Sequence, residues 1–205
     1  VPVSEFLSAD ELTKVAADTM VGGATLTALL GTSAWYAPGA SVAYLVDSIL
    51  NDQKKIASAY NNLGNIFEKQ GNYTQALEHH LKSLKIKEEM KDTLAMASSY
   101  NNIGIILKYK NNYEKALEYY NKGLEINIKA NNKKSTGQAY NNIGSVYQDM
   151  IKKGIYLKNL DSKEKLYEIC LENYFNALKI DEEYENMDGS ATVLNNIGSL
   201  FFYDG

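Results

Sequence analysis

The sequence contains no arginine, one cysteine, two prolines and two histidines. Without guanidinium groups the chain cannot form the bidentate clamps that many proteins use to hold carboxylates and phosphates. The lone Cys170 excludes a disulfide framework and favours a reducing compartment, so we expect a cytoplasmic protein. The prolines are Pro2 and Pro38, so nothing after Pro38 forbids helix.

The titratable residues show no pattern typical of a catalytic or metal site. His79 and His80 are adjacent and have no second ligand pair at metal-binding spacing, so we predict no metal site. The carboxylate pairs Glu88-Glu89 and Glu182-Glu183 lie among lysines, as solvated charge does. A net charge of −4 also gives no basic balance that favours a nucleic-acid partner.

Residues 19–46 are uncharged and numerous enough to cross a bilayer. Gly, Ser, Thr and Pro interrupt this stretch, and it contains neither Ile nor Phe, so we expect no membrane span. The acidic Glu5 and Asp10, and the lack of a basic start, likewise argue against a secretory signal.

The dominant feature is a five-residue motif, Tyr-Asn-Asn-Leu/Ile-Gly, that occurs four times, with Leu in place of Tyr in the last copy. The copies begin at Tyr60, Tyr100, Tyr140 and Leu194, so two intervals are 40 residues and the third is 54. A fixed period of this size indicates a stacked array of repeats.

Each unit contains two amphipathic helical patterns. In the first unit, apolar residues at helical spacing predict a helix over about 54–70 and a second over about 74–90, separated by Gly71-Asn72. The recurring Tyr-x-x-Leu/Ile-Gly and Ala-Leu patterns resemble the tetratricopeptide repeat family across about 150 residues, and the 40-residue period resembles its long-helix subclass in kinesin light chains and bacterial regulators. The resemblance implies an all-α superhelical solenoid of about 3.5 helix-turn-helix repeats behind a short N-terminal helical segment, with units at about 54–93, 94–133, 134–187 and a partial 188–205.

Small residues in the motif predict close helix packing. We expect Gly64, Gly104, Gly144 and Gly198 to let the second helix of a unit approach the first, with Ala76 and Ala116 on the opposite side. The recurring tyrosines are expected in the core first and as a ligand platform second. Cys170 occupies a small-residue position, so we interpret it as a buried apolar side chain rather than a reactive thiol. By the same periodicity His80 should pack inward and His79 should face outward.

The last two units depart from the pattern. The third carries about 14 extra residues near 151–164. They predict either a longer first helix with a looser turn or a partner-specific loop. The fourth unit has only a first helix, at about 190–203, and its Phe201 and Phe202 need a cover. We therefore expect a truncated chain with an output domain missing beyond Gly205.

Residues 1–53 form a separate predicted segment. Ser8 and Glu11 make a capping box for a helix over about 9–30, and a second helix follows Pro38 with apolar residues at spacings of three and four from Val42. This segment resembles the C-terminal domain of malate dehydrogenases of the lactate-dehydrogenase-like family, most specifically in Gly31-Thr-Ser-Ala-Trp-Tyr-Ala-Pro-Gly39. The resemblance places Ser33 and Ala34 near the substrate in that family.

The rest of that family's catalytic apparatus is missing from the sequence. No G-x-G-x-x-G motif opens a βαβ unit, no histidine lies in the resembling segment, and no arginine is available as a carboxylate clamp. We therefore interpret residues 1–53 as a non-catalytic fragment without cofactor. Residues 51–55 fit both the end of a dehydrogenase helix and an inter-repeat linker. Recombination, an engineered fusion or an assembly error all remain explanations of the junction.

The asparagine pairs of the motif are the candidate site. Adjacent helical positions point about 100° apart, so both members of a pair cannot be buried behind the apolar stripe. In the tetratricopeptide family the second asparagine matches a ligand-contacting position in the concave groove, and a carboxamide can hold an extended peptide backbone. The alternative is that the amides bond to neighbouring helices and fix the stack. The predicted peptide-binding residues are Asn61, Asn62, Asn101, Asn102, Asn141, Asn142 and Asn196.

These patterns predict a non-catalytic scaffold for a protein or peptide, as the sensing part of a larger bacterial regulator. One alternative is a malate dehydrogenase remnant that completes a site with another chain. Another is a chimaeric chain without an evolved function.

Overall fold

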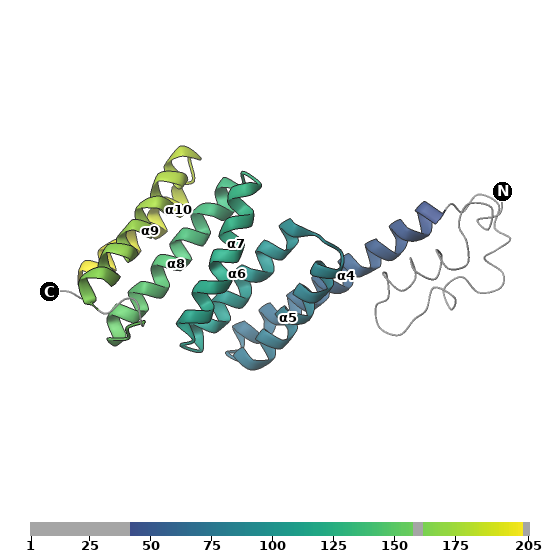
Figure 1. Ribbon diagram of the computed structural model, residues 1–205, viewed down its shortest axis with the longest axis horizontal. Helices are drawn as coiled ribbons and strands as arrows, with labels where there is room; N and C mark the ends of the chain where they lie inside the picture. The colour runs from purple at the N-terminus through teal and green to yellow at the C-terminus, as the bar shows by residue number, and fades with distance from the viewer. Residues whose placement is uncertain (1–41, 158–161, 203–205) are drawn as a thin grey trace.

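The computed structural model describes residues 42–157 and 162–202. All the regular elements in these residues are α-helices, and antiparallel pairs of them stack along the long axis of the molecule (Figure 1). The predicted all-α repeat architecture is therefore confirmed. We call α4, α6, α8 and α10 the A helices and α5, α7 and α9 the B helices. Their bounds are α4 Val42–Lys69, α5 Tyr73–Glu89, α6 Thr93–Tyr109, α7 Tyr113–Lys129, α8 Lys133–Lys153, α9 Lys163–Glu183 and α10 Met187–Phe202.

Short polar turns separate the helices from α4 to α8. The side chain of Asn72 accepts a hydrogen bond from the backbone N–H of Gln75, and Asp92, Asn132 and Ser162 cap their helices in the same way. The residue before the cap takes the left-handed conformation in the turns from α4 to α5 and from α6 to α7, with φ of 72° at Gly71 and 57° at Asn111. The turn predicted at Gly71-Asn72 is thus confirmed.

Helix α4 departs from the expected break between the two segments. It runs without interruption for 28 residues from Val42 to Lys69, so the separate helices expected before and after residues 51–55 are one, and the linker alternative is wrong. Asp, Gln and Lys are tolerated in a helix, and neither Gly nor Pro occurs from Val42 until Gly64. The domain boundary at 53/54 stays a prediction. The helix expected over 9–30, and Ser33 and Ala34, lie outside the described residues.

In each of the first three units, an aromatic ring of the B helix covers a glycine of the A helix. A Cβ atom built on Gly64, Gly104 or Gly144 would lie 2.6–2.7 Å from a ring atom of His80, Tyr120 or Tyr174 respectively. Real Cβ atoms essentially never come this close, so only glycine admits these rings. The predicted close packing of A and B helices is confirmed in these three units.

Cys170 takes the same small-residue position as Ala76 and Ala116, and all three side chains are fully buried. Its Sγ donates to the carbonyl oxygen of Gly144 at 3.3 Å. The predicted burial is therefore confirmed, and burial raises the pKa of the Cys170 thiol to about 12; its low reactivity stays a prediction.

The extra residues of the third unit divide among two helices and the loop between them. Helix α8 continues 13 residues past Tyr140, whereas α6 continues nine past Tyr100. Helix α9 begins seven residues before Cys170, whereas α7 begins three before Ala116. Four residues thus lengthen each helix and six lengthen the loop. This confirms the longer helix and looser turn; the partner-specific role of the loop stays a prediction, and residues 158–161 lie outside the described part.

The A helix of the fourth unit, α10, leaves an apolar stripe uncovered. Leu194 and Phe201 are more than half exposed, and a Cβ on Gly198 would meet nothing within 4 Å. The equivalent positions in the second unit are the partly buried Tyr100, the buried Gly104 and the buried Leu107.

No helix in the described part of the chain is long and apolar enough to cross a membrane.

Candidate functional site

The asparagine pairs of consecutive A helices hydrogen-bond to one another. The Nδ2 of Asn102 donates to the Oδ1 of Asn61 at 2.9 Å. The same bond joins Asn142 to Asn101 at 2.7 Å and Asn196 to Asn141 at 2.9 Å. We call these six residues the asparagine ladder. The structure therefore brings together six of the seven predicted site residues and realises the stack-fixing alternative directly.

Only Asn62 among the predicted residues has no place in the ladder, because no unit precedes it among the described residues. Its side chain is exposed. At the other end Asn195 is likewise exposed, because no described unit follows to use its amide.

The ladder bonds leave much of each carboxamide unused. A carboxamide has two N–H donors and an oxygen with two lone pairs. The first asparagine of each pair uses its oxygen, and the second uses one N–H. The ladder residues are only partly buried. Unused N–H donors and oxygen acceptors therefore alternate along this face, so holding the stack and binding a peptide are compatible tasks.

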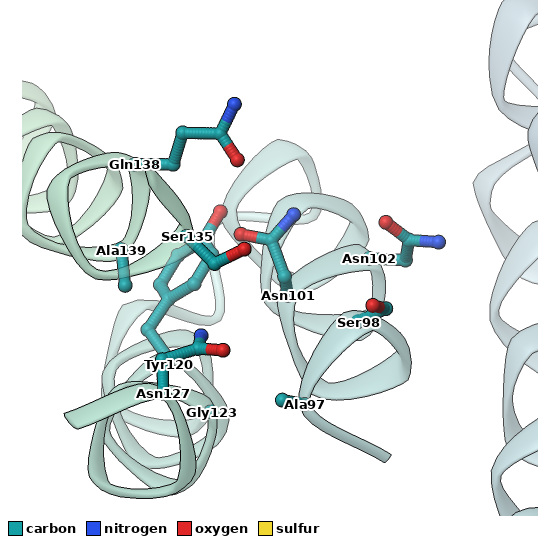
Figure 2. A pocket seen from close by; sticks show the side chains of 10 residues that line it. All are labelled: Ala97, Ser98, Asn101, Asn102, Tyr120, Gly123, Asn127, Ser135, Gln138 and Ala139. Carbon is teal, nitrogen blue, oxygen red and sulfur yellow. The ribbon is translucent and has the colours of Figure 1, made fainter. Parts of the chain in front are cut away.

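A pocket of about 230 Å³ lies beside the ladder between α6, α7 and α8. Asn101 and Asn102 contribute to its lining from α6, and Ser135 and Gln138 contribute from α8 (Figure 2). None of its ten lining residues is a carboxylate or an ammonium group. The pocket thus continues the neutral, hydrogen-bonding surface that the ladder begins.

Asn127 on α7 is a lining residue that the sequence-based prediction missed. Its side chain is only 7% exposed, and among the described residues its amide has no hydrogen-bond partner. In Figure 2 it points from α7 toward the space below Ser135 and Asn101. A signal was available, because the equivalent positions 40 residues earlier and 54 later are also polar, as Lys87 and Asp181.

Those two equivalents have partners, unlike Asn127. The Nζ of Lys87 donates to Ser99 at 2.7 Å, and Asp181 accepts from the side chain of Asn186 at 2.7 Å. Among the described residues, Asn127 is the one of the three whose side-chain amide has no partner, and it lines the pocket.

Both histidines pack against other residues of the first unit. His80 is fully buried, and neither ring nitrogen has a partner; burial, reinforced by the charges of Lys87 and His79, lowers its pKa to about 4. The predicted outward orientation of His79 is wrong, because its ring stacks on Phe67 at 5.2 Å and on Tyr60 at 5.9 Å between centroids. Within the described ranges, no group of three or more His, Cys, Asp or Glu residues is placed to hold a metal ion.

The tyrosines divide between core and surface. Tyr120 and Tyr174 are buried, as the core interpretation predicts, and the hydroxyl of Tyr174 donates to Gln148 at 2.7 Å. Tyr60, Tyr100 and Tyr140, which precede the asparagine pairs, are only partly buried.

Comparison with known proteins finds two unrelated likenesses. The tetratricopeptide repeat family model matches residues 55–129. A 56-residue segment is 88% identical to the malate dehydrogenase of Flavobacterium johnsoniae, covering 27% of this chain and 18% of that enzyme. The malate dehydrogenase of Bacteroides thetaiotaomicron is 69% identical over 55 residues, with the same coverage. The chain thus spans less than a fifth of the length of these relatives.

A solved structure supports the fold of the repeats. The N-terminal domain of stress-induced protein-1 from C. elegans superposes with a TM-score of 0.50 at 15% identity, covering 72% of this chain and 96% of that domain. At this identity the likeness concerns the fold alone. Residues 55–129 thus match the tetratricopeptide repeat family, in agreement with the glycine-centred helix pairs, and a short further segment is similar to malate dehydrogenases.

Proposed function

We propose that the chain is a non-catalytic scaffold that binds an extended peptide along the asparagine ladder. The observation that carries the proposal is the set of three Asn–Asn hydrogen bonds between successive A helices, which leaves donors and acceptors unused on one face. An extended peptide backbone presents alternating N–H and C=O groups that complement such a face. The tetratricopeptide likeness supports a role in protein interaction.

The absence of catalysis is part of the proposal. The sequence has no arginine and no dinucleotide-binding glycine motif, and Cys170 is buried. A place in the cytoplasm, as the sensing part of a larger bacterial regulator, completes the proposal. It rests on the lone cysteine and on the likeness to bacterial proteins.

A second candidate is a malate dehydrogenase remnant that completes a site with another chain. The 88% identity over 56 residues favours it. Titration with NADH, followed by its fluorescence, tests this candidate directly. Saturable binding would support it, and we expect none.

The ladder allows a test that separates binding from stacking. Asn61→Asp with Asn101→Asp keeps the accepting oxygen of two of the three ladder bonds and removes the unused N–H donors of these two residues. A matched control, Gln70→Glu with Asn121→Asp, makes the same charge change at exposed positions. Circular dichroism melts of all three proteins would check that the stack persists.

The measurement is capture from a library of extended peptides. We expect the parent and the control to capture the same peptides and the ladder variant to lose them, because each lost donor weakens the contact and each new carboxylate repels peptide carbonyl groups. Equal capture by all three stable proteins would remove the ladder from consideration as a binding surface.

A further inference from the structure

We propose that the pocket between α6, α7 and α8 receives the carboxamide side chain of one Asn or Gln residue of the bound peptide. The inference rests on the proposed function, since the ladder would hold the peptide backbone beside the pocket. Asn101 and Asn102 belong to both the ladder and the pocket lining. A peptide on the ladder can therefore direct a side chain into the pocket.

The buried end of the pocket sets the hydrogen-bonding requirement. Asn127 is more than nine-tenths buried and keeps both its N–H donors and its oxygen without a partner among the described residues. A side chain that offers only a donor, or only an acceptor, leaves either the N–H groups or the oxygen of Asn127 without a hydrogen bond. A carboxamide supplies both on adjacent atoms, so it can form a paired set of hydrogen bonds with Asn127.

The charge of the lining excludes ionised guests. A carboxylate or an ammonium group would lose water on entry and meet no opposite charge, since the lining residues carry none. The hydroxyl of Tyr120 does not supply one, because burial raises its pKa and keeps it protonated. The equivalent position holds Lys87 in the first unit and Asp181 in the third, so the neutral choice distinguishes the middle unit.

The size and walls of the pocket exclude most other neutral guests. Its volume of about 230 Å³ is ample for one side chain, and Ala97, Gly123 and Ala139 contribute small apolar surfaces to its walls. An apolar side chain would fill the space but offer the Asn127 amide no hydrogen bond. A carboxamide on a short apolar stem can contact the small apolar wall residues and hydrogen-bond to Asn127 at the buried end.

The experiment scans one peptide. A peptide captured by the parent chain is synthesised with each position varied to all amino acids, and each variant is assayed on the parent, Asn127→Asp and Asn127→Leu. For the parent we expect one position to prefer Gln or Asn by about tenfold over apolar and charged residues. Asn127→Asp should shift that preference to Lys or Arg, and Asn127→Leu should shift it to apolar residues. Thermal melts confirm that both variants fold.

Asn121→Asp is the matched control, because it makes the same change on an exposed part of α7. It should leave the preference unchanged. A position preference that stays the same in both folded Asn127 variants would overturn the assignment while leaving the peptide-binding proposal intact. If the parent protein preferred charged or apolar residues at every peptide position, that result would also overturn the assignment.

A small probe distinguishes a failure of the pocket proposal from a failure of the peptide-binding proposal. N-acetylglutamine methylamide and its glutamate counterpart are titrated against isotope-labelled protein, and the side-chain amide signal of Asn127 is followed by nuclear magnetic resonance. If no peptide is captured, a shift with the glutamine probe alone supports the pocket and leaves only the peptide-groove proposal refuted. No shift of Asn127 with the glutamine probe would refute the pocket.

Discussion

Replacing Gly104 and Gly198 in turn with alanine measures how much the space that a glycine leaves for an aromatic ring contributes to the stability of a unit. Both glycines occupy the same position in the repeat and lie within an A helix. Alanine favours helix over glycine by about 1 kcal/mol at either site, so this gain cancels when the two variants are compared. The remaining difference is steric.

The steric difference follows from the neighbours of each Cβ. At Gly104 the new Cβ would lie 2.7 Å from Cε1 and 2.8 Å from Cδ1 of Tyr120, whose ring is buried in the core and has little room to move. Overpacking of this kind costs about 1–3 kcal/mol. At Gly198 nothing lies within 4 Å, so no steric cost applies.

We therefore expect Gly198→Ala to stabilise the protein by about 0.5–1 kcal/mol and Gly104→Ala to be less stable than it by about 1–3 kcal/mol. Urea unfolding followed by circular dichroism gives both free energies, and thermal melting should separate the variants by about 2–4 °C for each kcal/mol. Equal stabilisation by both alanines would refute the reasoning, because it would mean that Tyr120 does not need the space that Gly104 leaves.

Three further predictions follow from the buried groups and the ladder. The pKa of folded His80 is about 4, below its usual 6.5. The unfolded state therefore gains a proton first as the pH falls from 6.5 toward 4, and the free energy of unfolding drops by on the order of 3 kcal/mol. His80→Tyr, if it folds, should remove this pH dependence in urea titrations, and an unchanged pH slope would contradict the assignment. Cys170 should react with a thiol reagent only as fast as the protein unfolds, since its side chain is fully buried; rapid labelling of the native protein would count against this. A double-mutant cycle of Asn61→Ala and Asn102→Ala should give a coupling energy of about 0.5–1.5 kcal/mol, and a coupling near zero would show that their bond adds nothing to the stack.

The helix pairs and their glycine-centred packing could be predicted because they are periodic. Tyr60, Tyr100 and Tyr140 set the register, and the glycine four positions later marks where the B helix comes closest. The continuity of α4 could not be predicted so readily. Residues 51–55 are polar enough for a linker, and their helicity depends on helix formation from both sides rather than on an apolar stripe of their own.

The bonding pattern of the ladder depends on tertiary geometry. The sequence places two asparagines on each A helix, but which of them donates depends on how successive A helices are rotated about one another. The pocket depends on the same stacking. The repeat period predicts a polar residue at position 127. It does not predict that Asn127 lacks a partner, because the equivalent residues Lys87 and Asp181 hydrogen-bond to Ser99 and Asn186.

The most direct test of the central claim is nuclear magnetic resonance of the asparagine side-chain amides with a captured peptide. Binding along the ladder predicts that the Nδ2 signals of Asn61, Asn101 and Asn141 shift most, because their N–H groups are unused in the ladder. Shifts confined to the exposed faces of α5, α7 and α9, with the ladder amides unmoved, would contradict the account and place the interaction surface on the B helices.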